Sequence, residues 1–219
     1  SGCFGLGAIN NRSSLDYQGT NLNFSMGERN VRRLSIRHAG KFSDKFGYKI
    51  SGQVYSGTDW KYVDPVESRA RINALSSGEV DPRSVRIGAR DYDQSRVASE
   101  VRIDYRPTDD FSAVISGGYN SASTIEMTTL GAGLSDGWVS GYYQARLAYK
   151  DLFIQAYKNW TDAGDSFFLR EGGTLIDKSD LTVLQLQHAY KLTERQQFIY
   201  GTDALFTRPN TGGSINGAN

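Results

Sequence analysis

The chain of 219 residues contains two histidines and one cysteine, so its capacity for acid–base, nucleophilic or metal chemistry is narrow. His38 alternates in step with Leu34 and Ile36, and His188 alternates in step with Leu184. An imidazole can serve as a general base, but no recognisable nucleophile motif lies beside either histidine, and we interpret both as ordinary strand residues. One cysteine and two distant histidines give no zinc-binding spacing. We therefore expect a protein that is not an enzyme and that uses no metal or cofactor.

Charged side chains recur at alternate positions in several segments of the chain. Residues 96–119 show this best, because Val101 and Ile103 alternate there with Arg102 and Asp104. A period of two is typical of a β-strand with one apolar face and one polar face. The charged residues that we single out on the polar face are Arg33, Arg37, Arg96, Glu100, Arg102, Asp104 and Arg146.

Nine segments with this alternation follow one another along the chain. They are residues 20–26, 31–42, 46–56, 96–106, 111–119, 138–150, 152–161, 181–192 and 197–206. The connections alternate between short turns, such as Pro107–Asp110, and long loops. The long loops are residues 57–94, 121–137, 162–180 and 207–219, and the first is expected to hold a short helix near Pro65 to Leu75. Short turns at one end and long loops at the other are typical of outer-membrane barrels.

Aromatic residues on the apolar faces gather beside the short turns. They are Phe42, Tyr48, Tyr105, Phe111, Tyr149, Tyr190 and Phe198. Tyr119, Trp160 and Phe206 stand near the opposite ends of their strands. Rings of this kind suit the lipid headgroup level, and rows of them form the aromatic girdles of membrane barrels. We therefore interpret the seven as membrane-interface aromatics.

The predicted fold class is all-β: an antiparallel up-and-down transmembrane β-barrel, present in part, with about nine strands of a larger barrel. Nine strands leave two unpaired edges, and unpaired backbone groups are costly in lipid, so further strands are expected to complete the barrel. The net charge of +1 gives no reason to expect nucleic acid as a partner. The sequence has no run of 18 apolar residues that would predict a membrane-spanning helix.

Two long stretches resemble one known family. Residues 27–65 resemble the first barrel strands of TonB-dependent outer-membrane receptors, and they read GERNVRRLSIRHAGKFSDKFGYKISGQVYSGTDWKYVDP. Residues 195–219 look like a mid-barrel strand and loop of the same family, and they read RQQFIYGTDALFTRPNTGGSINGAN. Gly7-Ala8-Ile9-Asn10 looks like the last strand of the plug domain, so residues 1–13 are expected to be the tail of the plug and residues 14–219 barrel. The resemblance implies a TonB box, a globular plug and a 22-stranded barrel, of which this chain would be the N-terminal part of the barrel.

The resemblance also implies a function. The chain would be part of a receptor in the bacterial outer membrane for active uptake of a scarce nutrient, such as a siderophore or other iron chelate, cobalamin or a glycan. Its partners would be outer-membrane lipid, the plug domain, the remaining barrel strands and the TonB complex, and the seven charged residues would line the lumen and face the plug. Two alternatives stay open: a passive outer-membrane channel complete within this chain, and a soluble β-sandwich that binds carbohydrate through Trp60, Trp138 and Trp160.

Overall fold

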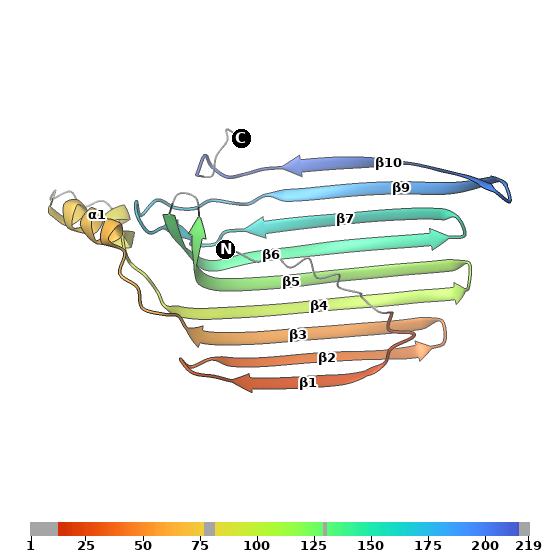
Figure 1. The fold of residues 1–219 in the computed structure, drawn as a ribbon, viewed down its shortest axis with the longest axis horizontal. Coiled ribbons are helices and arrows are strands. Elements are labelled where there is room, and N and C mark those ends of the chain that lie inside the picture. The colour runs from red at the N-terminus through yellow and green to blue at the C-terminus, as the bar shows by residue number, and fades with distance from the viewer. Residues whose placement is uncertain (1–12, 77–81, 129–130, 215–219) are drawn as a thin grey trace.

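The computed structural model describes residues 13–76, 82–128 and 131–214. One antiparallel sheet dominates this part of the chain (Figure 1). Its strands are β1 (Gly19–Met26), β2 (Arg32–Ser43), β3 (Phe46–Thr58), β4 (Asp93–Thr108), β5 (Phe111–Thr128), β6 (Gly131–Tyr149), β7 (Leu152–Asp162), β8 (Phe167–Phe168), β9 (Asp180–Thr193) and β10 (Gln196–Arg208). The connection between β3 and β4 contains helices α1 (Pro65–Ser76) and α2 (Pro82–Arg86). The predicted all-β class and the nine long strands are confirmed.

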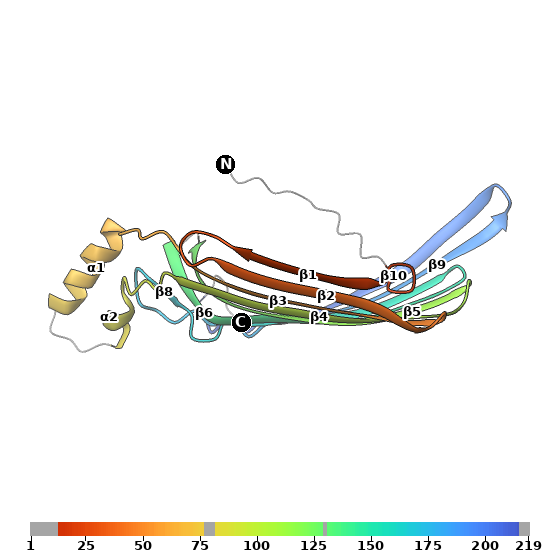
Figure 2. The same cartoon turned by 90° about the horizontal axis from the view of Figure 1, so that it is seen from below.

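The strands follow an up-and-down order. Each long strand pairs with the next one along the chain, from β1 through β7 to β9 and β10, and the short β8 pairs with β6. Within the described residues no pairing joins β1 to β10, so the sheet has two free edges and does not close. Figure 2 shows the sheet edge-on as a bowed layer. The architecture is therefore an open, barrel-like sheet.

The two-residue turns after β2, β4, β6 and β9 lie at one end of the sheet, and the long connections after β3 and β7 lie at the other end, where the five-residue connection between β1 and β2 also lies (Figure 1). The turn after β4 is shorter than predicted, because Pro107 belongs to the strand and only Asp109 and Asp110 remain between β4 and β5. The register shifts between Tyr105 and Thr108. Such a bulge accepts a proline, which has no N–H to donate to a neighbouring strand.

The prediction of a long loop at 121–137 is wrong. β5 continues to Thr128 and β6 begins at Gly131, and these extensions pair with each other, for example Met127 with Ala132. The glycines and small polar residues of this segment indicated a loop. Serine, threonine and isoleucine between 121 and 128 nevertheless suit a strand, and a register shift between Ala122 and Thr124 bends the pair without ending it.

At the end of the sheet opposite the two-residue turns, the long connections after β3 and β7 pack against the extended ends of β5 and β6. We call this substructure the outer cap, and within the described ranges it consists of residues 59–92, 124–136 and 163–179. Its buried core is Ala132, Leu134, Phe167 and Leu169. The predicted helix near Pro65 to Leu75 is confirmed as α1. Neither helix in the described part of the chain is long and apolar enough to cross a membrane.

Two further contacts order the connection between β3 and β4, one within it and one to the rest of the outer cap. Arg90 donates two hydrogen bonds of 2.7 Å to the carboxylate of Glu67, which is buried, and these bonds raise the pKa of the Arg90 guanidinium. The backbone N–H of Gly88 donates to the carbonyl of Leu169 at 2.8 Å. The outer cap is therefore an organised layer rather than a set of independent loops.

Candidate functional site

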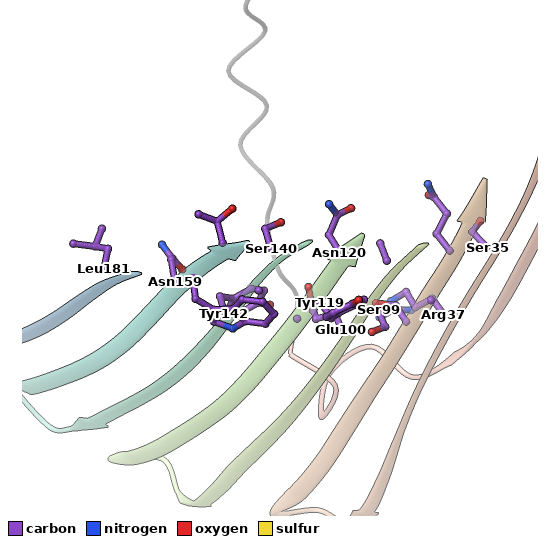
Figure 3. A pocket seen from close by; sticks show the side chains of 18 of the residues that line it. Ser35, Arg37, Ser99, Glu100, Tyr119, Asn120, Ser140, Tyr142, Asn159 and Leu181 are labelled. Atoms are coloured by element: carbon purple, nitrogen blue, oxygen red, sulfur yellow. The ribbon is translucent and has the colours of Figure 1, made fainter. Parts of the chain in front are cut away.

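One face of the sheet carries a large hollow, and we call this face the concave wall. The hollow has a volume of about 810 Å³, and its lining extends from Asn21 on β1 to Thr207 on β10. Figure 3 shows Arg37, Glu100 and Tyr142 among the side chains that line it. Because the lining comes from both edge strands, the hollow follows the curvature of the whole sheet. The concave wall is therefore the surface on which a bound molecule would be enclosed.

All seven charged residues predicted for the polar face lie on this wall. The register shows why, because Arg37, Ser51 and Glu100 are cross-strand neighbours on β2, β3 and β4. Side chains two positions apart share a face, and this rule places the others on the same side. The seven are Arg33, Arg37, Arg96, Glu100, Arg102, Asp104 and Arg146. They spread over β2, β4 and β6 and do not form a single cluster.

Near the short turns, the charges of the concave wall are paired with each other. Lys49 lies 2.7 Å from Glu100, and Arg102 lies 2.7 Å from Asp104. Arg102 and Lys49 are each 8% exposed, and Asp104 is 4% exposed. A buried charge requires a partner and hydrogen bonds. The Arg102–Asp104 pair supplies both, and the Lys49–Glu100 pair supplies the opposite charge. Lys49 was absent from the predicted site, although its alternation with Tyr48 and Ile50 marks it as a wall residue.

The segment before β1 lies against the same part of the wall. The Ser14 hydroxyl donates to the Asp104 carboxylate at 2.7 Å, and its backbone N–H donates to the same oxygen at 3.2 Å. Gly47 makes room for this contact, because a Cβ there would lie 2.5 Å from the Ser14 Oγ. No local sequence pattern connects Ser14 with Asp104, which lies 90 residues away. The predicted plug strand at residues 7–10 lies outside the described residues.

A row of neutral polar side chains continues the wall from β5 to β9. Ser116 donates to Gln144 at 3.4 Å, Gln144 donates to Gln155 at 3.2 Å, and Gln155 donates to Gln185 at 2.8 Å. Arg146 also donates to Gln155, at 3.0 Å. The amides bond to one another across neighbouring strands and give this half of the wall hydrogen-bonding capacity without net negative charge.

The opposite face of the sheet is apolar and open. Val101 is 48% exposed, Ile115 is 61% exposed and Leu186 is 41% exposed. No second layer of described residues covers them, although a soluble sheet normally buries such a face. The burial of the two faces is thus inverted in the short-turn half of the sheet: Lys49, Arg102 and Asp104 are buried on the concave wall, while large aliphatic groups are exposed on the outer face.

The predicted membrane-interface aromatics lie on this outer face beside the short turns. Phe42 is 4.8 Å from Tyr48, Tyr105 is 6.2 Å from Phe111, and Phe111 is 6.3 Å from Tyr149, measured between ring centroids. Phe46, which was not among the predicted aromatics, lies directly after a turn, and its ring centroid is 5.7 Å from that of Phe42 and 6.3 Å from that of Tyr105. These six rings form a continuous row from β2 to β6.

Two of the seven predicted aromatics lie apart from this continuous row. Tyr190 and Phe198 are paired across β9 and β10. At the other end of the outer face, Tyr119 and Trp160 lie 6.4 Å apart. Aromatic side chains therefore flank the exposed apolar face at both ends of the strands.

The two histidines contact tyrosines on the same outer face. His38 lies 2.7 Å from the Thr20 hydroxyl and 3.0 Å from the Tyr48 hydroxyl, and His188 lies 2.7 Å from the Tyr200 hydroxyl.

In the described part of the chain, no group of three or more histidine, cysteine, aspartate or glutamate side chains could hold a metal ion. The arrangement as a whole suits reversible binding of a polar molecule on the concave wall. In comparisons with known protein families, curated proteins and solved structures, no match to this chain was found.

Proposed function

We propose that this chain is part of a TonB-dependent receptor of the bacterial outer membrane, which takes up a scarce nutrient by active transport. The observation that carries this proposal is the inverted burial of the sheet. On the outer face Val101 is 48% exposed and Ile115 is 61% exposed, whereas Arg102, the next residue after Val101 on β4, is 8% exposed on the concave wall. Hydrocarbon is the solvent that suits an uncovered aliphatic face, and a wet interior suits a charged one.

The spacing of the aromatic residues supports a membrane position for the outer face. On β5, Phe111 and Tyr119 are eight residues apart and lie on the same face. At a rise of about 3.4 Å per residue they are separated by about 27 Å along the strand. A strand tilt of about 35–45° reduces this to about 20 Å along the membrane normal, close to the apolar band of about 25 Å in membrane barrels. The two aromatic groups would then lie at the two headgroup levels.

The concave wall is proposed as one side of a water-filled lumen. The plug domain of the receptor would lie against it, near the place where Ser14 and Asp16 contact Asp104 and Arg106. Because the edges of β1 and β10 are unpaired in the described sheet, we propose that the remaining barrel strands pair with them, since free strand edges are costly in lipid. The substrate would be a small molecule or a glycan, and the energy would come from the TonB complex.

The two alternatives fit the geometry less well. A channel complete within this chain requires a closed sheet, but no pairing joins β1 and β10 among the described residues. A carbohydrate-binding sandwich requires its tryptophans on one surface. Trp138 lies on the concave wall, where its indole N–H donates to Thr161, whereas Trp160 lies on the outer face and Trp60 lies in the outer cap beside Arg29.

Cell fractionation tests the proposed location. The full-length protein that contains this chain is expressed in a Gram-negative host, and the outer membrane, inner membrane and soluble fractions are separated. We expect the protein in the outer membrane, resistant to extraction by salt and by alkaline carbonate and released only by detergent. Recovery in the soluble fraction without detergent would contradict the proposal and favour the sandwich.

A further inference from the structure

A second hollow on the concave wall, of about 570 Å³, lies nearer to the outer cap. Arg33, Tyr55 and Arg96 line it together. Tyr55 pairs with Arg33 on one side and with Arg96 on the other, so the three are cross-strand neighbours in one layer. With neighbouring strands about 4.8 Å apart, the backbones of the two arginines are about 10 Å apart. Two arginines therefore stand on either side of Tyr55 in the sheet.

Neither guanidinium is neutralised by a carboxylate of the described residues. Arg33 donates to the amide oxygen of Gln53 at 2.8 Å through Nη2 and at 3.2 Å through Nε, and Arg96 donates to the amide oxygen of Asn120 at 2.6 Å. Within the part of the chain that the structure describes, neither side chain forms an ion pair with a carboxylate. The bonds to Gln53 and Asn120 orient the guanidinium groups without cancelling their charge.

In the half of the concave wall near the short turns, by contrast, the cations are paired with carboxylates. There Lys49, Arg102 and Arg106 each have an acidic partner. Among the described wall residues, Arg37 and Arg146 also lack an acidic partner, but Arg37 has Ser51 as its cross-strand neighbour and Arg146 bonds to Gln155. Arg33 and Arg96 are thus two uncompensated cations in one layer, beside a hollow whose lining extends to Glu126 in the outer cap.

We propose that the hollow between Arg33 and Arg96 binds a small molecule through its oxyanion groups, either carboxylates or phosphates. This inference rests on the proposed function and narrows its substrate class to anionic compounds, in preference to neutral glycans. Arginine presents a planar fork of N–H donors that matches carboxylate and phosphate oxygens, and such charge-assisted bonds are about twice as strong as neutral ones. Tyr55, which lies between the two arginines in the sheet, lines the same hollow. Glu126, which also lines the hollow, lies four residues beyond the partner of Arg96 and thus about 13 Å further along its strand.

Calorimetric titration of the full-length protein in detergent tests the site. Citrate is the carboxylate probe, pyrophosphate is the phosphate probe, and maltotriose is the neutral probe. The R33Q/R96Q variant keeps side chains of similar size but removes both charges, and R33K/R96K keeps the charges but removes the fork. R32Q is the matched control, because Arg32 is an exposed arginine on the same strand as Arg33 but on the outer face. Thermal unfolding of each variant shows that the fold is retained.

We expect at least one anionic probe to bind and maltotriose not to bind. R33Q/R96Q should weaken anion binding by about 100-fold, or about tenfold for each charged hydrogen-bonding group, R33K/R96K should weaken it less, and R32Q should change it by less than about twofold. Tighter binding of citrate would identify a carboxylate site, and tighter binding of pyrophosphate a phosphate site. The proposal is overturned if no anion binds, if R33Q/R96Q binds as tightly as the unaltered protein, or if maltotriose binds as well as the anions.

The outcome for the site is separable from the outcome for the proposed function. If the protein fractionates with the outer membrane but R33Q/R96Q binds anions normally, the inference about the substrate fails and the receptor proposal stands. If arginine-dependent anion binding is found in a protein that needs no detergent, the site stands and the membrane proposal fails.

Discussion

Ile115 is the residue at which a single substitution tests the environment of the outer face. It lies on β5, four residues from Phe111 and four residues from Tyr119, and it is 61% exposed. At about 3.4 Å per residue, each aromatic residue is about 14 Å away along the strand. Its cross-strand neighbours are Ile103 and Ala145. Under the proposed function, Ile115 therefore contacts hydrocarbon near the middle of the bilayer.

The expected cost of Ile115→Arg follows from this position. An arginine on the lipid face of a membrane barrel lowers stability by about 2–4 kcal/mol at the bilayer midplane and by about 0–1 kcal/mol near the interfaces. A substitution of an exposed side chain on a water-facing surface usually changes stability by less than about 0.5 kcal/mol. The two environments therefore predict effects that differ by at least about 1.5 kcal/mol.

The assay is equilibrium unfolding of the full-length protein in phospholipid vesicles, with guanidinium chloride as denaturant and tryptophan fluorescence as the signal. Ser121→Arg is the matched control, because Ser121 lies on the same strand and the same face, two residues beyond Tyr119. We expect Ile115→Arg to lower the free energy of unfolding by about 2–4 kcal/mol and Ser121→Arg by at most about 1 kcal/mol. Equal effects of the two substitutions, or an effect of Ile115→Arg below about 0.5 kcal/mol, would refute the reasoning.

Three further predictions concern the outer cap and the segment before β1. Leu169→Ala should lower the local unfolding free energy of the outer cap by about 2–5 kcal/mol, because Leu169 is fully buried; hydrogen exchange should accelerate there and stay unchanged in β3 and β4. Gly47→Ala should displace the Ser14 hydroxyl, since the new Cβ would lie 2.5 Å from it, and limited proteolysis after residue 13 should become faster, whereas an unchanged rate would count against this contact. The N–H of Val66 donates to the Asp64 carboxylate at the start of α1 and holds the pKa of that carboxyl below 3.8. The hydrogen bond from Val66 to the Asp64 carboxylate therefore stabilises the start of α1 fully above the ordinary pKa of the carboxyl, and this stabilisation is lost as the pH falls through the lowered pKa. The Val66 amide resonance should accordingly shift at acid pH in the wild type and stay constant in Asp64→Asn.

The strands could be predicted because alternation is a local property of the sequence. On β3, Lys49 is charged and belongs to the concave wall, whereas Ile50 is apolar and belongs to the outer face. Their partners on β4, Arg102 and Val101, follow the same rule, so each side chain indicates its own face. The extension of β5 and β6 through residues 121–137 could not be predicted in this way. Glycine and small polar residues there carry little alternation, and the pairing of Met127 with Ala132 decides the structure through backbone hydrogen bonds.

The sequence predicts which face of the sheet carries the candidate site residues, but it does not predict which of them lie next to one another. Period two assigns Arg33 and Arg96 to the same wall, yet only the register across Tyr55 brings them into one layer. Likewise, no pattern near Ser14 indicates Asp104 as its partner. Contacts of this kind depend on how strands are shifted relative to one another, and single-strand alternation carries no information on that shift.

Neighbouring spin labels on β5 test the central claim about the two faces. In a background in which the single cysteine is replaced by serine, Ile115→Cys places a nitroxide label on the outer face and Ser116→Cys places one on the concave wall. Collision with oxygen, which concentrates in lipid, is compared with collision with a water-soluble nickel chelate, for the full-length protein in vesicles. The account predicts that oxygen reaches the label at 115 more readily than nickel does, with the reverse at 116. A label at 115 that collides mainly with the nickel chelate would contradict it.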